Sequence, residues 1–181
     1  MSKINEKLFY SWGGGDEQFT PKETVECLLP YIQHLKNKII WCPFDLEDSE
    51  FVQVLKGDGF NVLYSHIDYG QDFMEYEPDT WDVIISNPPY KNKRMFWERC
   101  LSLGKPFALL MPVNTLSDSL INTTMKGRDE ELQLLIPSRR TWFYNENGVL
   151  RKSPSFKAIY YGVRLFTRQI ILADMKKQQE I

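Results

Sequence analysis

The sequence has few residues of the kinds that hold metals or form disulfides. It contains two histidines, His34 and His66, and three cysteines that form no Cys-x-x-Cys pair. No zinc site, other histidine-based metal site or disulfide framework is therefore expected. Isolated, reduced thiols are typical of cytoplasmic proteins, and we expect a cytoplasmic location.

Long apolar runs and a strong excess of positive charge are also missing. The chain has no apolar run of about 18 residues, so we expect no membrane segment. Residues 1–10 mix Lys3, Glu6 and Lys7 among apolar residues and lack the core of a signal peptide. The net charge of −2 does not favour a non-specific nucleic-acid binder, although cations can still gather locally.

The composition predicts one globular domain. The chain has 181 residues, of which 43% are hydrophobic and 14% aromatic, and it shows no internal repeat or linker. We expect a single domain over residues 1–181, with a flexible arm at 1–18 and a frayed helix in the tail at 168–181.

Short apolar runs alternate with helical patterns through the first two-thirds of the chain. This rhythm predicts an α/β fold. A capping box of Thr20 and Glu23 around Pro21 predicts that the first helix begins there and continues to about residue 35. Further helices are expected at residues 49–56, 95–103 and within 113–124. Strands are expected at residues 38–42, 61–66, 82–86, 106–112, 132–137 and 158–163.

The stretch Val83-Ile84-Ile85-Ser86 followed by Asn87-Pro88-Pro89-Tyr90 is the most informative in the sequence. The β-branched run could be a strand or part of a buried helix, but a helix could not continue through two prolines. In an open α/β sheet, ligands bind beyond the carboxyl ends of the strands. The tetrapeptide is therefore expected to border a ligand site.

The tetrapeptide suits the activation of a poor nitrogen nucleophile. The Asn87 side-chain oxygen and the Pro88 carbonyl can both accept from an amine, which localises its lone pair. Proline fixes φ and has no N–H to compete for these contacts. Tyr90 could stack on a planar substrate. Such a site works by positioning and preorganised polarity and requires no base with a tuned pKa.

The tetrapeptide after an apolar strand resembles the catalytic motif of amino-methyltransferases that use S-adenosylmethionine. The best-known members methylate the exocyclic amine of adenine, and release-factor glutamine methyltransferases carry the same motif. Phe19-Thr20-Pro21 resembles a second motif of the adenine enzymes. The resemblance covers roughly residues 19–166. It implies a class I methyltransferase fold, which is a mostly parallel seven-stranded sheet with helices on both faces and an antiparallel last strand.

The cofactor loop departs from the family pattern. The family form is Asp-Pro-Phe-x-Gly-x-Gly; here Cys42 replaces the first Asp, Pro43 and Phe44 match, and both glycines are missing. The acidic residues of this loop, Asp45, Glu47 and Asp48, could face the cofactor, or Asp48 or Ser49 could simply cap the next helix. The doubly wound fold and the resemblance together imply these contacts to S-adenosylmethionine: Phe19, Thr20, Pro21, Phe44, Asp45, His66, Asp68, Asp72 and Phe73.

Cations close to the tetrapeptide and in two later segments are interleaved with aromatic residues. Either these are solvated loops or they contact phosphates. The residues implied in nucleic-acid binding are Lys91, Lys93, Arg94, Arg139, Arg140, Arg151 and Lys152.

The sequence therefore favours methylation of the adenine N6 amine in DNA or RNA. A separate target-recognition domain does not fit in the chain, so recognition would come from loops, an unpaired substrate or a partner subunit. The alternatives are a protein-glutamine methyltransferase, a small-molecule amine methyltransferase, and an inactive relative that binds nucleic acid or protein. The target sequence and the oligomeric state are left open.

Overall fold

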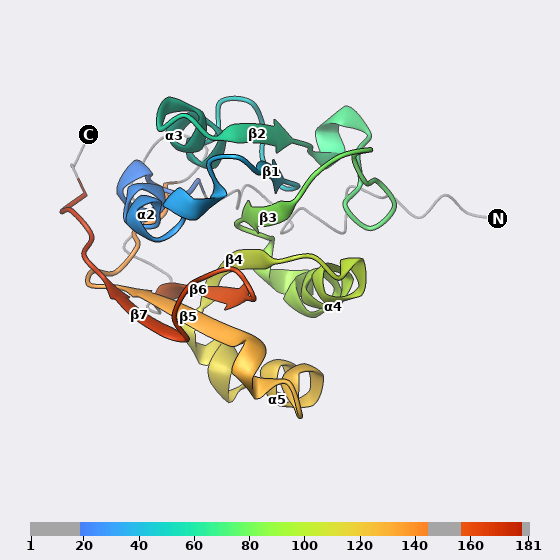
Figure 1. The fold of residues 1–181 in the computed structure, drawn as a ribbon, viewed down its shortest axis with the longest axis vertical. Helices are drawn as coiled ribbons and strands as arrows, with labels where there is room; N and C mark the ends of the chain where they lie inside the picture. Colours follow the sequence, from blue (N-terminus) through green and yellow to red (C-terminus); the bar gives the residue numbers. More distant parts are fainter. Residues whose placement is uncertain (1–18, 145–156, 179–181) are drawn as a thin grey trace.

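A computed structural model describes residues 19–144 and 157–178. The expected arm at residues 1–18 and the cations Arg151 and Lys152 lie outside these ranges. The described chain forms a sheet in the order β2-β1-β3-β4-β6-β5-β7 (Figure 1). The strands are β1 (Ile39–Cys42), β2 (Asn61–Tyr64), β3 (Val83–Ser86), β4 (Phe107–Pro112), β5 (Leu132–Pro137), β6 (Ala158–Val163) and β7 (Ile170–Ala173).

The sheet is mostly parallel. Strand β1 runs parallel to β2 and β3, β3 runs parallel to β4, and β7 runs parallel to β5. Strand β6 is antiparallel to both of its neighbours, β4 and β5. In the described residues, six strands therefore point one way and one points the other. The predicted α/β class and seven-stranded, mostly parallel sheet are confirmed.

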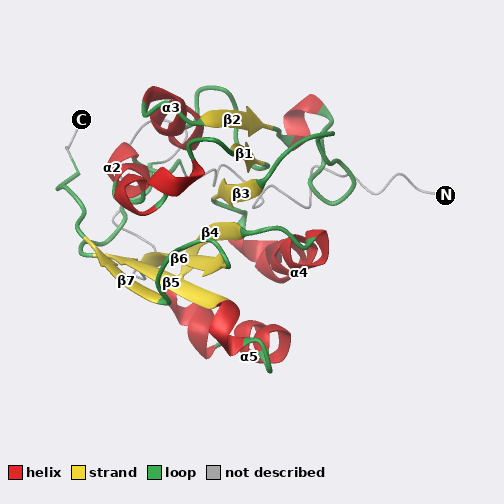
Figure 2. Cartoon of the chain, viewed as in Figure 1, coloured by secondary structure: helices red, strands yellow, loops and turns green. Residues whose placement is uncertain are grey.

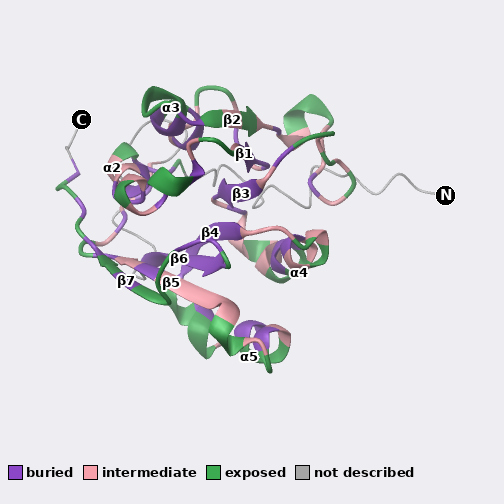
Figure 3. Cartoon of the chain, in the orientation of Figure 1, coloured by how far each residue is buried: buried purple, intermediate pink, exposed green. Residues whose placement is uncertain are grey.

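Alternation along the strands divides the core into two layers. Ile40 and Cys42 of β1 belong to one buried cluster, whereas Trp41 between them belongs to the other. The first layer holds residues of α2 (Lys22–Glu26) and α3 (Glu50–Gly57), and the second those of α4 (Lys93–Leu103) and α5 (Ser119–Met125). The two helix pairs cover opposite faces of the sheet (Figure 2), and the central strands are buried between them (Figure 3).

The first helix is much shorter than the sequence suggested. Helix α2 ends at Glu26, and two 3₁₀ turns, Leu29–Tyr31 and Gln33–Leu35, follow it. Pro30 explains the end, because a proline ring clashes with the carbonyl four residues earlier, which here is that of Glu26. The capping-box prediction was also wrong, since Pro21 is the N-cap and no side chain caps the helix.

The tail is a strand where a frayed helix was expected. Residues Ile170–Ala173 pair with β5 from Leu134 to Pro137, and Ile171 and Ala173 join the core layer of α2 and α3. The antiparallel strand is consequently β6, and it is not the last one in the chain. A short apolar run is compatible with either structure, and here the open edge of β5 provides strand partners. In the part of the chain that the structure describes, no helix is long and apolar enough to span a membrane.

Candidate functional site at the carboxyl ends of β1, β2 and β3

The loops that follow β1, β2 and β3 leave the sheet at the same edge, because these strands are parallel. The backbone N–H of Asp45, after β1, donates to the Ser65 carbonyl after β2 at 3.2 Å. The Ser65 hydroxyl accepts from the Trp41 indole at 2.9 Å. These contacts fix the first two loops to one another beside the end of β3.

Asp45 connects the loop after β1 to β3. Its side chain is only 7% exposed and accepts hydrogen bonds from Ser49 at 2.8 Å and from Ser86 at 2.5 Å. Burial raises the pKa of this carboxyl to about 6, although both serine hydroxyls act in the opposite direction. Ser86 is the residue before Asn87, so Asp45 holds the strand end from which the tetrapeptide begins.

Asn87 is oriented by Thr20. The Asn87 side-chain nitrogen donates to the Thr20 hydroxyl oxygen at 3.1 Å, which directs the amide oxygen the other way. That oxygen is buried and has no hydrogen-bond partner among the described residues. The Pro88 carbonyl is the next backbone acceptor along the chain. The assignment of Asn87 and Pro88 as paired acceptors for a ligand stays a prediction, and the free Asn87 oxygen is compatible with it.

The rest of the tetrapeptide turns the chain from strand to helix. Pro89 has φ −58° and ψ 125°, and a 3₁₀ turn, Tyr90–Asn92, continues directly into α4. The Tyr90 ring meets the Phe143 ring edge-to-face with centroids 6.3 Å apart. Burial raises the pKa of the Tyr90 hydroxyl far above its ordinary value. The residue as a whole is half-buried, so a part of it remains exposed beside Asn87.

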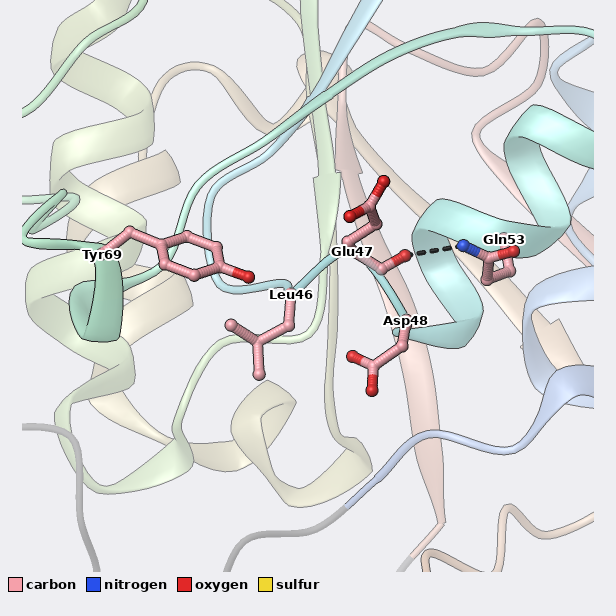
Figure 4. Close-up of a pocket in the computed structure, with 5 residues that line it drawn as sticks. All are labelled: Leu46, Glu47, Asp48, Gln53 and Tyr69. Atoms are coloured by element: carbon pink, nitrogen blue, oxygen red, sulfur yellow. Dashed lines mark hydrogen bonds between the residues drawn. The ribbon is translucent and has the colours of Figure 1, made fainter.

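A pocket opens between the loop after β1 and the turn after β2. It is lined by Leu46, Glu47, Asp48, Gln53 and Tyr69. The Gln53 side chain donates to the Glu47 carbonyl at 2.7 Å and so braces the loop on α3 (Figure 4). Tyr69 is 56% exposed and lies across the pocket from Gln53, with Leu46 between them (Figure 4). The pocket therefore combines an aromatic ring with two exposed carboxylates.

Four other residues expected to contact the cofactor lie outside the lining of this pocket. The His66 ring accepts from the Asp68 backbone N–H at 3.2 Å and lies 3.4 Å from its carboxylate, so this pair follows β2 as predicted. Asp72 accepts from the Met74 backbone at 2.8 Å and forms a turn. Phe73 is 1% exposed and packs on Trp41, which makes it a core residue.

Two expected cofactor residues have aromatic or backbone partners. Phe44 is half-buried and meets Phe73 and Phe96 with centroids 4.9 Å and 4.8 Å apart. Phe19 is exposed and forms a two-way backbone bridge with Tyr144. None of the nine residues assigned to the cofactor in the sequence analysis lines the pocket, whereas Glu47 and Asp48, raised there only as acidic loop residues, do.

Most of the described cations near the tetrapeptide already have partners. Lys93 pairs with Asp118 at 2.9 Å, and Arg94 pairs with Glu98 at 3.1 Å. Lys91 is exposed and has no ion-pair partner among the described residues. In the segment after β5, Arg139 donates to the Met175 carbonyl at 3.0 Å, and Arg140 lies over the Trp142 ring at 5.1 Å.

Sequence reasoning missed Tyr69 and Gln53. The available signal for Tyr69 was an aromatic residue in a polar turn after the second strand, the position where this kind of sheet binds ligands. Gln53 lies one turn into a helix and gives no sequence signal of its own. No cluster of three or more potential metal ligands occurs within the described residues.

Comparison with solved structures gives several matches. No family model matches the sequence, and no curated protein matches it either. The chain is similar to the crystal structure of a release factor-specific protein-(glutamine-N5) methyltransferase from Alicyclobacillus acidocaldarius, with 15% identity and a TM-score of 0.40. The match covers 78% of this chain and 92% of the other. At this level of similarity, the neighbour assigns neither a family nor a substrate.

Proposed function

We propose that this protein transfers a methyl group from S-adenosylmethionine to a conjugated amine or amide nitrogen held by Asn87 and Pro88. The observation that carries the proposal is the buried oxygen of Asn87, which has no hydrogen-bond partner within residues 19–144 and 157–178. A buried acceptor without a donor costs about 1–3 kcal/mol, so it calls for an explanation. A substrate N–H would satisfy that oxygen.

The pocket after β1 and β2 suits the cofactor despite the missing glycines. When bound, S-adenosylmethionine supplies an electrophilic methyl group on a positively charged sulfonium. Glu47 and Asp48 place negative charge in the pocket, which favours a cationic ligand, and carboxylates also accept from ribose hydroxyls. Tyr69 offers an exposed ring for the adenine. We therefore assign Glu47, Asp48, Gln53 and Tyr69 to cofactor binding; the sequence had raised the acidic loop residues as possible contacts, but not Gln53 or Tyr69.

The substrate nitrogen would be held by two acceptors of fixed direction. Thr20 keeps the Asn87 amide nitrogen occupied, so the oxygen is the end presented to the substrate. Asp45 and Ser86 hold the strand end, and the Pro88 ring fixes φ at the second acceptor. When both acceptors take an N–H of the substrate, its lone pair is drawn out of conjugation. This is catalysis by positioning and fixed dipoles.

Adenine N6 in DNA or RNA is the first candidate substrate. Tyr90 follows the two acceptors and is only partly buried, so its exposed part can cover a flipped base. Lys91, the next residue, is exposed and available for a phosphate.

The side-chain amide of glutamine in a protein is the second candidate. Its support comes from the ion pairs of Lys93 with Asp118 and of Arg94 with Glu98, which occupy two of the three cations next to the tetrapeptide. The net charge of −2 also provides little general attraction for nucleic acid.

Methyl transfer to a panel of acceptors tests both candidates. The protein is incubated with methyl-labelled S-adenosylmethionine and single-stranded DNA, duplex DNA, RNA or glutamine-containing proteins, and products are identified by mass spectrometry. N6-methyladenine supports the first candidate, and N5-methylglutamine supports the second. Cofactor binding by calorimetry is measured in parallel, and a protein that binds no cofactor at millimolar concentration would refute the proposal.

A further inference from the structure

Strand β7 is an exposed edge of the sheet with an apolar outer row. It is the last strand in the sheet order, with β5 on one side and no strand on the other among the described residues. Ile170 and Leu172 are 62% and 78% exposed, the two highest values among the exposed large hydrophobic residues of the described chain. Natural edge strands are usually protected by charge, proline or a covering element, and this row has none of these protections at its centre.

The backbone of β7 has donors and acceptors facing outward. The carbonyls of Gln169 and Ala173 accept from the amides of Leu134 in β5 and of Ser138, the residue after β5. Because the direction of the backbone groups alternates along a strand, those of Ile170 and Leu172 point away from β5. A second strand could therefore pair with β7 through these two residues.

The charges beside the row are symmetric about Ile171. Arg168 lies three residues before it and Asp174 three residues after it, and both side chains are exposed. Neither has an ion-pair partner in the described parts of the chain. In an antiparallel pair centred on Ile171, Ile170 lies opposite Leu172 of the other strand, and Arg168 lies opposite Asp174.

Neighbouring registers lack this match. Centring on Leu172 would place Ile170 opposite Asp174 and Arg168 opposite Lys176, a like-charge pair. Centring on Ile170 would place Leu172 opposite Arg168. Opposite charges across a strand pair stabilise it and like charges destabilise it. The strand is thus complementary to itself in one register.

We propose that β7 pairs with β7 of a second copy of this chain, antiparallel and about a two-fold axis at Ile171. The two sheets become continuous, and both Ile170–Leu172 pairs are shielded from water. A two-fold contact of this kind closes on itself and gives a dimer. The contact is small compared with interfaces of standard size. We therefore expect weak association, so that the dimer forms only at high protein concentration. The inference does not rest on the proposed activity.

Sedimentation velocity between about 10 µM and 500 µM tests the proposal in the full chain. The parent is expected to shift from monomer toward dimer over this range. Leu172→Lys, and separately Arg168→Asp or Asp174→Arg, should each weaken dimerisation at least about tenfold. The double variant R168D/D174R restores opposite charges in the same register and should return to within about threefold of the parent.

Matched controls separate pairing from folding. Lys126→Glu changes an exposed charge after α5 and should leave the association unchanged. Circular dichroism melts of all variants should agree with the parent, because the substituted side chains are exposed. A protein that stays monomeric at 500 µM overturns the proposal, as does a dimer unaffected by Leu172→Lys. Assembly beyond two copies, or failure of the charge swap to rescue, also overturns it.

Discussion

Replacing Asp45 with asparagine should make the protein less sensitive to pH. The carboxyl is buried, and its pKa is raised from 3.8 to about 6 in the folded protein. Asparagine is the same size, and it can accept from one serine while donating to the hydroxyl oxygen of the other. We therefore expect the fold and the position of β3 to be retained in this variant.

The sign of the effect follows from proton uptake. Between pH 3.8 and about 6, the folded state binds a proton at Asp45 that the unfolded state has lost. The stabilisation from this group is therefore full below pH 3.8 and is lost as the pH rises through about 6. The whole shift of roughly 2 units corresponds to about 3 kcal/mol. Of this, about 2 kcal/mol falls between pH 4.5 and 7.5.

Urea unfolding at a series of pH values measures the effect. The free energy of unfolding of Asp45→Asn, relative to the parent, should rise by about 2 kcal/mol from pH 4.5 to 7.5. Asp118→Asn is the control, because Lys93 lowers the pKa of Asp118 below 3.8, so its stabilisation is lost only at lower pH and its difference from the parent should be nearly flat between pH 4.5 and 7.5. If the Asp45→Asn difference is flat with pH, the carboxyl is not a buried, protonatable group and the reasoning fails.

Three further substitutions test separate parts of the account. Thr20→Val removes a hydrogen bond of about 1 kcal/mol that orients Asn87, so methyl transfer should fall about 2–10-fold. Thr20→Ser keeps the hydroxyl and should transfer at nearly the parental rate, and equal loss in both variants would contradict this role. Tyr69→Ala should weaken cofactor binding, measured by calorimetry, by about 1–3 kcal/mol, whereas Tyr69→Phe keeps the ring and should bind as the parent does. Unchanged affinity in Tyr69→Ala would mean that Tyr69 does not contact the cofactor. Gly162→Ala would place a Cβ 2.8 Å from the Phe166 ring, so the free energy of unfolding, measured with urea, should fall by about 1–3 kcal/mol. An unchanged value would mean that the ring moves freely out of the way.

The central strands could be predicted because their sequences leave few alternatives. Val83, Ile84 and Ile85 are β-branched and are followed by two prolines, so only a strand that ends there is compatible with them. Ser49 was recognised as a possible cap, and it caps α3 by accepting from Val52. These are local signals, and the structure agrees with them.

The errors have identifiable physical causes. The first helix was drawn too long because an apolar period of i, i+3, i+4 continues past Pro30, although the ring of Pro30 prevents an α-helix there. The tail was taken for a helix because Ile170–Ala173 is too short to show a period. Its structure depends on pairing with β5, a strand more than thirty residues away.

The candidate site was predictable in its chemistry and not in its details. Asn87 and Pro88 could be named because the tetrapeptide carries both acceptors. The bond between Asn87 and Thr20 joins residues 67 positions apart, and the raised pKa of Asp45 depends on burial, so neither could be found from the local sequence. Phe73 was expected beside the cofactor, yet a phenylalanine after a turn is equally suited to the core position it occupies.

The most direct test of the central claim is methyl transfer by Asn87→Ala, measured together with its affinity for S-adenosylmethionine. With the amide oxygen gone, we expect transfer to fall at least about 100-fold, since fixed polar groups at a reacting centre contribute on that scale. The cofactor dissociation constant should stay within about twofold of the parent. Transfer at the parental rate would contradict the role of Asn87 and, with it, the proposed function.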